Sequence, residues 1–279
     1  MSNANLKSRL SGKAQSKNTT PTEMPVPKKT PTPKETSAPK EVPTTELSMV
    51  DSGYVALATN AIGIISENLK NQPLSYQLFD VVKAPTGGIT MFSVPGLSGD
   101  DIQKELTGII LNYTTPRAYW ETSEPIEGTP PVCYSRDSFT SFEGKSCITC
   151  PYNEFGSKNG DSNAKACKES VEAYLLRPDN IMPIIVRIPV TSKFIFQKYM
   201  TRLVSNMIPL CGVVTKITLE KVTSTGGQPY AKYNFEAVDT LSHEETANAR
   251  SYGQKFAEMV NVAYETEVKA AVVAETAEA

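Results

Sequence analysis

Residues 213–236, VVTKITLEKVTSTGGQPYAKYNFE, contain the clearest structural pattern in the chain. Gly226 and Gly227 supply a turn, and β-branched and aromatic residues dominate both sides of it. Apolar residues alternate along both halves, at Val213, Ile217 and Leu219 and then at Ala231, Tyr233 and Phe235. A period of two places such side chains on one face of a strand. The stretch therefore predicts an antiparallel hairpin with strands over 211–223 and 230–238.

Helices are predicted on both sides of this hairpin. Three- and four-residue spacing predicts a helix over 191–207 that buries Phe194, Phe196, Tyr199, Met200, Leu203 and Val204. The same spacing predicts a long helix from 241 to about 273. The only histidine, His243, falls at the start of that helix. A single histidine in this position is better explained as a capping or exposed residue than as part of a catalytic triad.

More strands are predicted nearer the N-terminus. Runs of apolar, β-forming residues indicate strands over 107–115 and 181–190. Two further runs, 76–82 and 89–94, flank the turn sequence Pro-Thr-Gly-Gly at 85–88 and predict a second hairpin.

Two shorter helices complete the predicted core. Apolar spacing indicates one over 49–69, although Gly53 and Gly63 weaken the pattern. Ser98, followed by two aspartates, is typical of the start of another helix, over 98–106. We therefore expect an α+β core over 47–240, built as an OB-like antiparallel β-barrel or as a mixed sheet.

Four of the five cysteines cluster in a region, 116–180, where regular periodicity is lost and which we interpret as an insertion. Their spacing is C-x13-C-x2-C-x16-C, formed by Cys133, Cys147, Cys150 and Cys167. The Cys-Ile-Thr-Cys pair is typical of a metal-binding knuckle, and four thiolates complete a tetrahedral sphere with no open position for a catalytic water. We predict one structural Zn²⁺ ion, with an iron–sulfur cluster or unligated thiols as alternatives.

The residues next to Cys167 and Cys211 in the sequence indicate the local structure at these two cysteines. Cys167 lies in AKACKESVEAYLL, which we expect to form a short helix at or just after this residue. Cys211, beside Leu210 and Gly212, is expected to be a small buried apolar residue.

Aromatic and cationic residues alternate through the predicted insertion. Single-stranded nucleic acid needs both types, because aromatic rings stack on unpaired bases while Lys and Arg contact the phosphates. The candidate binding residues are Arg117, Tyr119, Trp120, Arg136, Lys145, Tyr152, Phe155 and Lys158. The alternative is that Tyr119, Trp120 and Phe142 pack around the zinc knuckle instead.

Charge is unevenly distributed along a chain whose formal net charge is only -2. The first 46 residues are rich in Pro, Thr, Ser and Lys, so we expect a disordered basic arm over 1–46. The last segment, 241–279, is acidic and is either a solvated helix face or a surface that recruits replication or recombination proteins. No apolar signal-peptide core or membrane-spanning run is visible, so we expect a cytoplasmic protein without membrane contact.

Motifs of common enzyme classes are missing from the sequence. There is no GxxxxGK[ST] phosphate-binding loop and no GxGxxG after a predicted strand. The paired acidic residues are better explained as first-turn helix charges. We therefore do not expect an enzyme.

Several pieces of the chain resemble a family of phage and mobile-element proteins that contain zinc and bind single-stranded DNA. They are RAYW at 117–120, CITCPYNEFGS at 147–157, AKACKE at 164–169, and the hairpin at 213–236. The resemblance implies an OB-like single-stranded DNA-binding protein of DNA replication or recombination, in a bacterium or a phage-infected host. The alternative is a zinc-stabilised, non-enzymatic adaptor or structural interaction protein, or an enzyme subunit with no active site of its own.

Overall fold

The structure is a computed structural model that describes most of the chain after the predicted arm. The described residues are 53–70, 76–122, 129, 131–158, 164–178 and 180–277. The arm predicted over 1–46 therefore lies outside them. In the described part, no helix combines the length and the apolar character that crossing a membrane requires.

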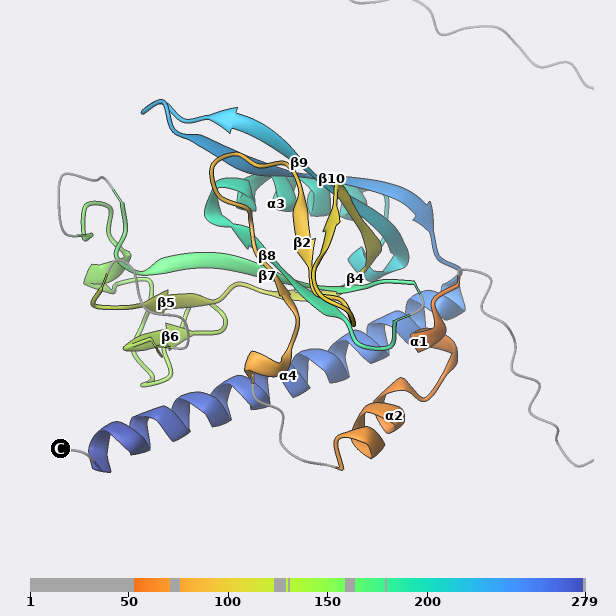
Figure 1. Cartoon of the computed structure of the whole chain (residues 1–279), viewed down its shortest axis with the longest axis horizontal. Helices are drawn as coiled ribbons and strands as arrows, with labels where there is room; N and C mark the ends of the chain where they lie inside the picture. Colours follow the sequence, from red (N-terminus) through yellow and green to blue (C-terminus); the bar gives the residue numbers. More distant parts are fainter. Residues whose placement is uncertain are drawn as a thin grey trace, which may run out of the picture. The chain divides into compact units, whose positions relative to one another are not determined.

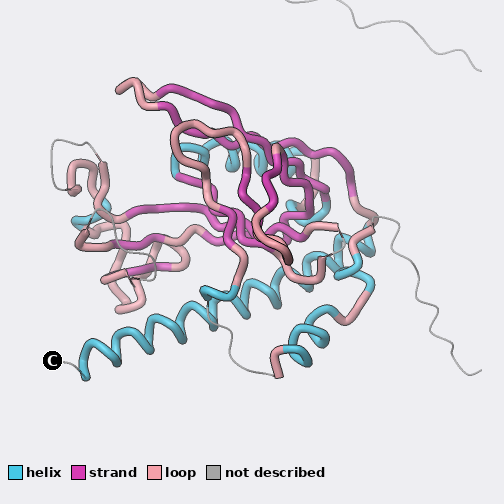
Figure 2. The backbone as a smooth tube through the Cα atoms, viewed as in Figure 1, coloured by secondary structure: helices cyan, strands magenta, loops and turns pink. Residues whose placement is uncertain are grey.

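A mixed α+β fold is confirmed (Figure 1, Figure 2). Its main sheet has eight strands, six of them in the order β1-β8-β7-β4-β9-β10, with β5 and β6 attached through β7. The strands are β1 Val81–Val82, β4 Glu105–Thr114, β5 Arg117–Tyr119, β6 Cys133–Ser135, β7 Lys168–Leu176, β8 Ile184–Pro189, β9 Val213–Thr223 and β10 Pro229–Thr240. All pairings in it are antiparallel except that of β1 with β8.

The helices lie on both sides of this sheet. They are α1 Val55–Ala58, α2 Ala61–Asn68, α3 Val190–Ser205 and α4 His243–Ala277, with single 3-10 turns at η1 Tyr76–Leu78, η2 Pro151–Asn153 and η3 Leu210–Gly212. The long C-terminal helix is thus confirmed. Its first turn is a capping box, in which Ser242 Oγ accepts from the Glu245 backbone and Glu245 Oε2 accepts from the Ser242 backbone.

The predicted hairpin at 213–236 is confirmed as β9 and β10. Tyr233 lies opposite Leu219, and Phe235 lies opposite Ile217. Strand β4 pairs with β9 only as far as Thr218. Beyond that residue no described strand lies beside the hairpin, and its tip projects past the sheet (Figure 1).

The main sheet curls into a half-barrel that stays open in the described residues. Its two outer strands, β1 and β10, are not paired with each other there. An OB-fold is a five-stranded, partly open Greek-key barrel, whereas this sheet has eight described strands. The fold therefore matches the broader expectation of a mixed α+β sheet, and the OB-like barrel is not confirmed.

Strand β7 is buried on both faces, which places the sheet between two apolar layers. Val171 and Leu175 pack with Phe196 of α3 and with Phe92. Tyr174 faces the other way, in a cluster with Phe256 and Val260 of α4. Because both faces are covered, β7 lacks the alternation of a half-exposed strand.

That burial explains why the helix expected after Cys167 is wrong. Val171 to Leu176 are all buried, so the apolar run carries no strand periodicity. β7, inside the insertion predicted over 116–180, is in fact a central strand of the sheet.

The second predicted hairpin is also wrong. Val81–Val82 pairs in parallel with β8. Phe92–Val94 forms β2 and pairs with β3, Asp101–Gln103, as a separate two-stranded sheet. Gly99 has φ +124, which no helix contains, so the segment predicted as a helix over 98–106 turns and becomes β3 and the start of β4 instead.

Two predicted helices differ in detail. The helix expected over 49–69 is broken into α1 and α2 at Asn60, whose side chain caps α2 by accepting from Gly63 N at 3.1 Å. In α3, Phe194 and Val204 are exposed rather than buried. Ser192, in the first turn of α3, is buried, and its Oγ accepts from Tyr233 N at 3.0 Å.

Candidate nucleic-acid interface

A groove of about 1320 Å³ runs along β5, β7 and β8 and is bordered by η1 and α4. Among the described residues, its lining contains six cationic side chains, from Lys83, Arg117, Arg136, Lys165, Lys168 and Arg187, and two acidic ones, from Glu169 and Glu172. Five aromatic rings also contribute, from Tyr76, Phe79, Trp120, Phe155 and Tyr264. The groove thus combines excess positive charge with aromatic rings, drawn from segments far apart in sequence.

Strand register places the main charges of this groove. Glu172 lies directly opposite Arg187 in the β7–β8 pair, and Glu169 lies opposite Arg117 in the β5–β7 pair. Opposite charges on directly paired residues attract each other. Arg187 interrupts the apolar run Ile-Ile-Val-Arg-Ile, and this position in a buried strand is the sequence signal that could have identified it.

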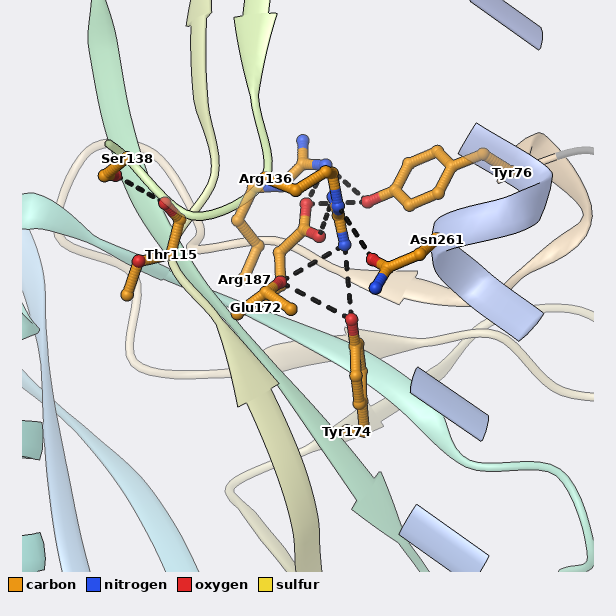
Figure 3. Close-up of polar contacts among 9 residues, drawn as sticks. Tyr76, Thr115, Arg136, Ser138, Glu172, Tyr174, Arg187 and Asn261 are labelled. Atoms are coloured by element: carbon orange, nitrogen blue, oxygen red, sulfur yellow. Dashed lines mark hydrogen bonds and ion pairs between the residues drawn. The ribbon is translucent and has the colours of Figure 1, made fainter. Parts of the chain in front are cut away.

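Glu172 is the centre of a buried ion network (Figure 3). It is 2% exposed. Its Oε1 accepts from Tyr76 Oη at 2.6 Å and from Arg187 Nη2 at 2.9 Å, and its Oε2 accepts from Arg136 Nη1 at 3.0 Å. Burial raises the pKa of Glu172, but Arg136 and Arg187 outweigh burial and hold the pKa below its usual value. Glu172 is therefore ionised.

Arg136 is held from several directions. Its Nε donates to Asn261 Oδ1 at 3.2 Å, and its Nη2 donates to the hydroxyls of Thr114 and Tyr174, each at 3.2 Å. Its guanidinium carbon also lies 5.0 Å from the centre of the Tyr264 ring. Arg136 thereby connects the segment after β6 to β4, β7 and α4.

A second ion cluster surrounds Glu169. Its carboxylate accepts from Arg117 Nη2 at 2.6 Å and from the ammonium of Lys193 on α3. Arg117 also donates to the side chain of Asn153. Arg117 therefore ties β5 and β7 to the cysteine-containing loops as well as lining the groove.

Half of the predicted nucleic-acid residues line the groove. Besides Arg117 and Arg136, they are Trp120, whose Nε1 donates to Thr129 O at 3.1 Å, and Phe155. Phe155 is 74% exposed and has the Lys165 ammonium 4.6 Å from its ring centre.

The other four predicted residues are not in the groove lining. Tyr119 and Tyr152 stack on each other, with ring centres 4.1 Å apart. Lys145 is 76% exposed and pairs with its neighbour Glu143, and Lys158 is half-buried. Conversely, Tyr76, Lys83, Lys168, Arg187 and Tyr264 line the groove but were not predicted.

Backbone and side-chain hydrogen bonds join the loops that carry the four clustered cysteines. Cys133 pairs with Tyr119 in β5–β6, and Cys167 N donates to Tyr152 O at 2.8 Å. Asn153 joins the knuckle internally, since its backbone N donates to Cys150 O and its side chain donates to Cys147 O, both at 2.9 Å.

The thiols of this cluster are free and influence one another. Burial raises the pKa of Cys167 to about 11; Arg117 opposes this, and the thiols of Cys150, Cys133 and Cys147 add to it. A set of four sulfur ligands matches the preference of Zn²⁺. Among the described residues, however, no three Cys, His, Asp or Glu side chains are arranged as a group that could hold a metal ion. Cys211 is buried in a separate apolar cluster, as predicted.

Comparison with known proteins does not extend this picture. No protein-family model, no curated protein and no solved structure matches the chain. The case for each site therefore depends on its own residues and contacts.

Proposed function

We propose that this chain is a non-enzymatic protein that binds single-stranded DNA along the groove between β5, β7, β8 and α4. The observation that carries the proposal is the composition of this groove, whose described residues supply six cations, two carboxylates and five aromatic rings. Cations outnumber carboxylates among the described lining residues, which favours a polyanionic ligand. The resemblance to phage and mobile-element proteins supports a role in replication or recombination.

A single strand suits this composition better than a duplex. Unpaired bases expose their faces, which stack on aromatic rings for about 1–3 kcal/mol per base. Phe155 and Trp120 offer rings at the groove, and the Trp120 indole is oriented by its hydrogen bond to Thr129. In a duplex the base faces are stacked on one another, so these rings would gain little.

We propose that a zinc ion held by Cys133, Cys147, Cys150 and Cys167 stabilises the loops beside the groove. Zinc supplies a closed tetrahedral centre to such a set of thiolates. The cysteine loops reach the groove through Asn153 and Arg117, and Tyr152 O accepts from Cys167 just before β7. The OB-like barrel expected from the sequence is also kept as a proposal for the curled sheet.

Binding is tested by fluorescence anisotropy with labelled oligo-dT and with a matched duplex. We expect oligo-dT to bind more tightly and its affinity to fall with salt. Lys165→Ala and Lys168→Ala should weaken binding. If the lysine contacts a phosphate, each variant should also reduce the slope of log affinity against log salt concentration by about 1. Lys145→Ala is the matched control, because Lys145 is outside the groove lining and should leave binding unchanged. Failure of wild type to bind oligonucleotides at low salt would overturn the proposal.

An adaptor is the second candidate, favoured by a different observation. A hollow of about 440 Å³ lies between α3 and the cysteine loops, and its apolar lining includes Phe139, Ile148 and Met200. Phe139 and Ile148 are both exposed. Apolar side chains gathered in an exposed hollow are typical of a protein contact. Phe139→Ser with Ile148→Ser should abolish such a contact and leave oligo-dT binding intact.

A further inference from the structure

The buried network around Glu172 contains more positive than negative charge. One carboxylate contacts two guanidinium groups, those of Arg136 and Arg187. The neighbouring phenols do not supply the missing negative charge, because burial, and after it the Glu172 carboxylate, raise the pKa of Tyr76 above its usual value. An uncompensated cation in a buried site is costly. The network is therefore electrically incomplete.

The two arginines differ in how far their hydrogen bonds are satisfied. Arg136 donates to Glu172, Asn261, Thr114 and Tyr174, which uses four of its five N–H groups. The hydrogen bonds of Arg187 to described residues come from Nη2, which donates to Tyr76 Oη at 3.0 Å and to Glu172 at 2.9 Å. Its Nε is buried without a partner among the described residues. Of the two arginines, Arg187 is therefore the less fully hydrogen-bonded.

Arg187 is also accessible to a ligand. Its side chain is 36% exposed, against 13% for Arg136 and 3% for Glu172. It lines the groove. A partly exposed guanidinium that lines a groove is suited to a phosphate, which accepts charge-assisted hydrogen bonds from it.

We propose that Arg187 is a phosphate-binding residue of the groove, and that Arg136, Glu172 and Tyr76 position it. The ligand is a phosphodiester of the bound strand, which supplies the negative charge that the network lacks. This assignment rests on the proposed function only for the source of the phosphate, because free inorganic phosphate has the same chemistry.

The source of the phosphate and the role of Arg187 are tested separately on the full chain. Sodium phosphate should raise the Tm of wild type by about 2–4 °C relative to sodium chloride at equal ionic strength, and should not do so for Arg187→Gln. Oligo-dT affinity should fall about ten- to a hundredfold in Arg187→Gln. Arg187→Lys keeps the charge but not the planar fork, so it should also lose affinity. Arg177→Gln is the control, since Arg177 has an unpartnered Nε but does not line the groove.

A second measurement needs no protein variant. In a series of oligo-dT strands just long enough to fill the groove, so that the strand cannot shift its register, each strand carries one neutral methylphosphonate linkage at a different position. Wild type should lose about tenfold in affinity at one position above the general decrease. A flat series, with phosphate failing to raise the Tm, overturns the assignment even if oligo-dT binds. Phosphate stabilisation that depends on Arg187 without any oligo-dT binding supports the site and refutes the proposed function.

Discussion

Glu172 is the residue that connects most of the groove's charges, since η1, the segment after β6, and β8 all contact its carboxylate. Glu172→Gln should lower the free energy of unfolding by about 3–5 kcal/mol, because the largely buried Arg136 and the partly exposed Arg187 lose their shared counter-charge. Denaturant melts measure this loss. Glu143→Gln removes an exposed carboxylate from the Lys145 pair and should leave stability unchanged, as exposed pairs contribute little.

The lowered pKa of Glu172 also predicts how the stability of the fold changes with pH. Its pKa is lower in the folded chain than the ordinary value of 4.5, so the folded state favours the ionised form. Its contribution is therefore complete above about pH 4.5 and is lost as pH falls through the lower, folded pKa. Unfolding midpoints between pH 7 and pH 3 should decrease more steeply in wild type than in Glu172→Gln. Parallel curves for the two proteins would contradict this.

Trp120 is the only tryptophan and reports directly on the groove. Oligo-dT should quench its emission if a base stacks on it, and Trp120→Ala should cost about 1–3 kcal/mol of binding. Trp120→Phe keeps an aromatic face and should recover part of that loss. Each variant must retain the wild-type Tm. Unchanged oligo-dT affinity in a folded Trp120→Ala would remove Trp120 from the interface.

At the scale of elements, the start of α3 is attached to β10 through one buried hydroxyl. Ser192 Oγ accepts from the backbone N of Tyr233 at 3.0 Å. Ser192→Ala would leave that buried N–H without a partner and should cost about 1–3 kcal/mol of stability. Thr191→Ala, one residue earlier and exposed, is the matched control and should have little effect. Equal stability of both variants in chemical denaturation would refute the role of Ser192.

The cysteine loops form the element whose stability we expect to depend on metal. Purified protein should contain about one zinc per chain, and Cys147→Ser or Cys150→Ser should release it and lower the Tm. Cys211→Ser changes a buried cysteine outside the cluster, so it should keep the zinc. Elemental analysis showing no zinc, with four thiols that react freely in the native protein, would rule out the metal site.

At the scale of the whole molecule, binding depends on local charge rather than on net charge. The formal net charge is -2, yet cations outnumber carboxylates in the groove. The described groove residues all lie after residue 75. A chain lacking 1–46 should therefore keep its oligo-dT affinity within about twofold at 0.15 M salt, where the basic arm is largely screened. A much larger loss would move the main binding site into the arm.

Local pattern determined several elements of this protein by itself. The hairpin of β9 and β10 and the helices α3 and α4 follow from periodicity and turn residues that act over a few positions. The spacing of the four cysteines likewise identified a candidate metal site before any fold was known. Trp120, Phe155, Arg117 and Arg136 were recognisable because they are close together in sequence.

Tertiary structure alone decided the rest. β7 is covered on both faces, so its sequence has no strand period, and only its place between β4 and β8 makes it a strand. Tyr76, Arg187 and Tyr264 join the groove from segments more than seventy residues apart. Their proximity arises from strand pairing and helix packing, which bring distant residues together without leaving a mark in the local sequence.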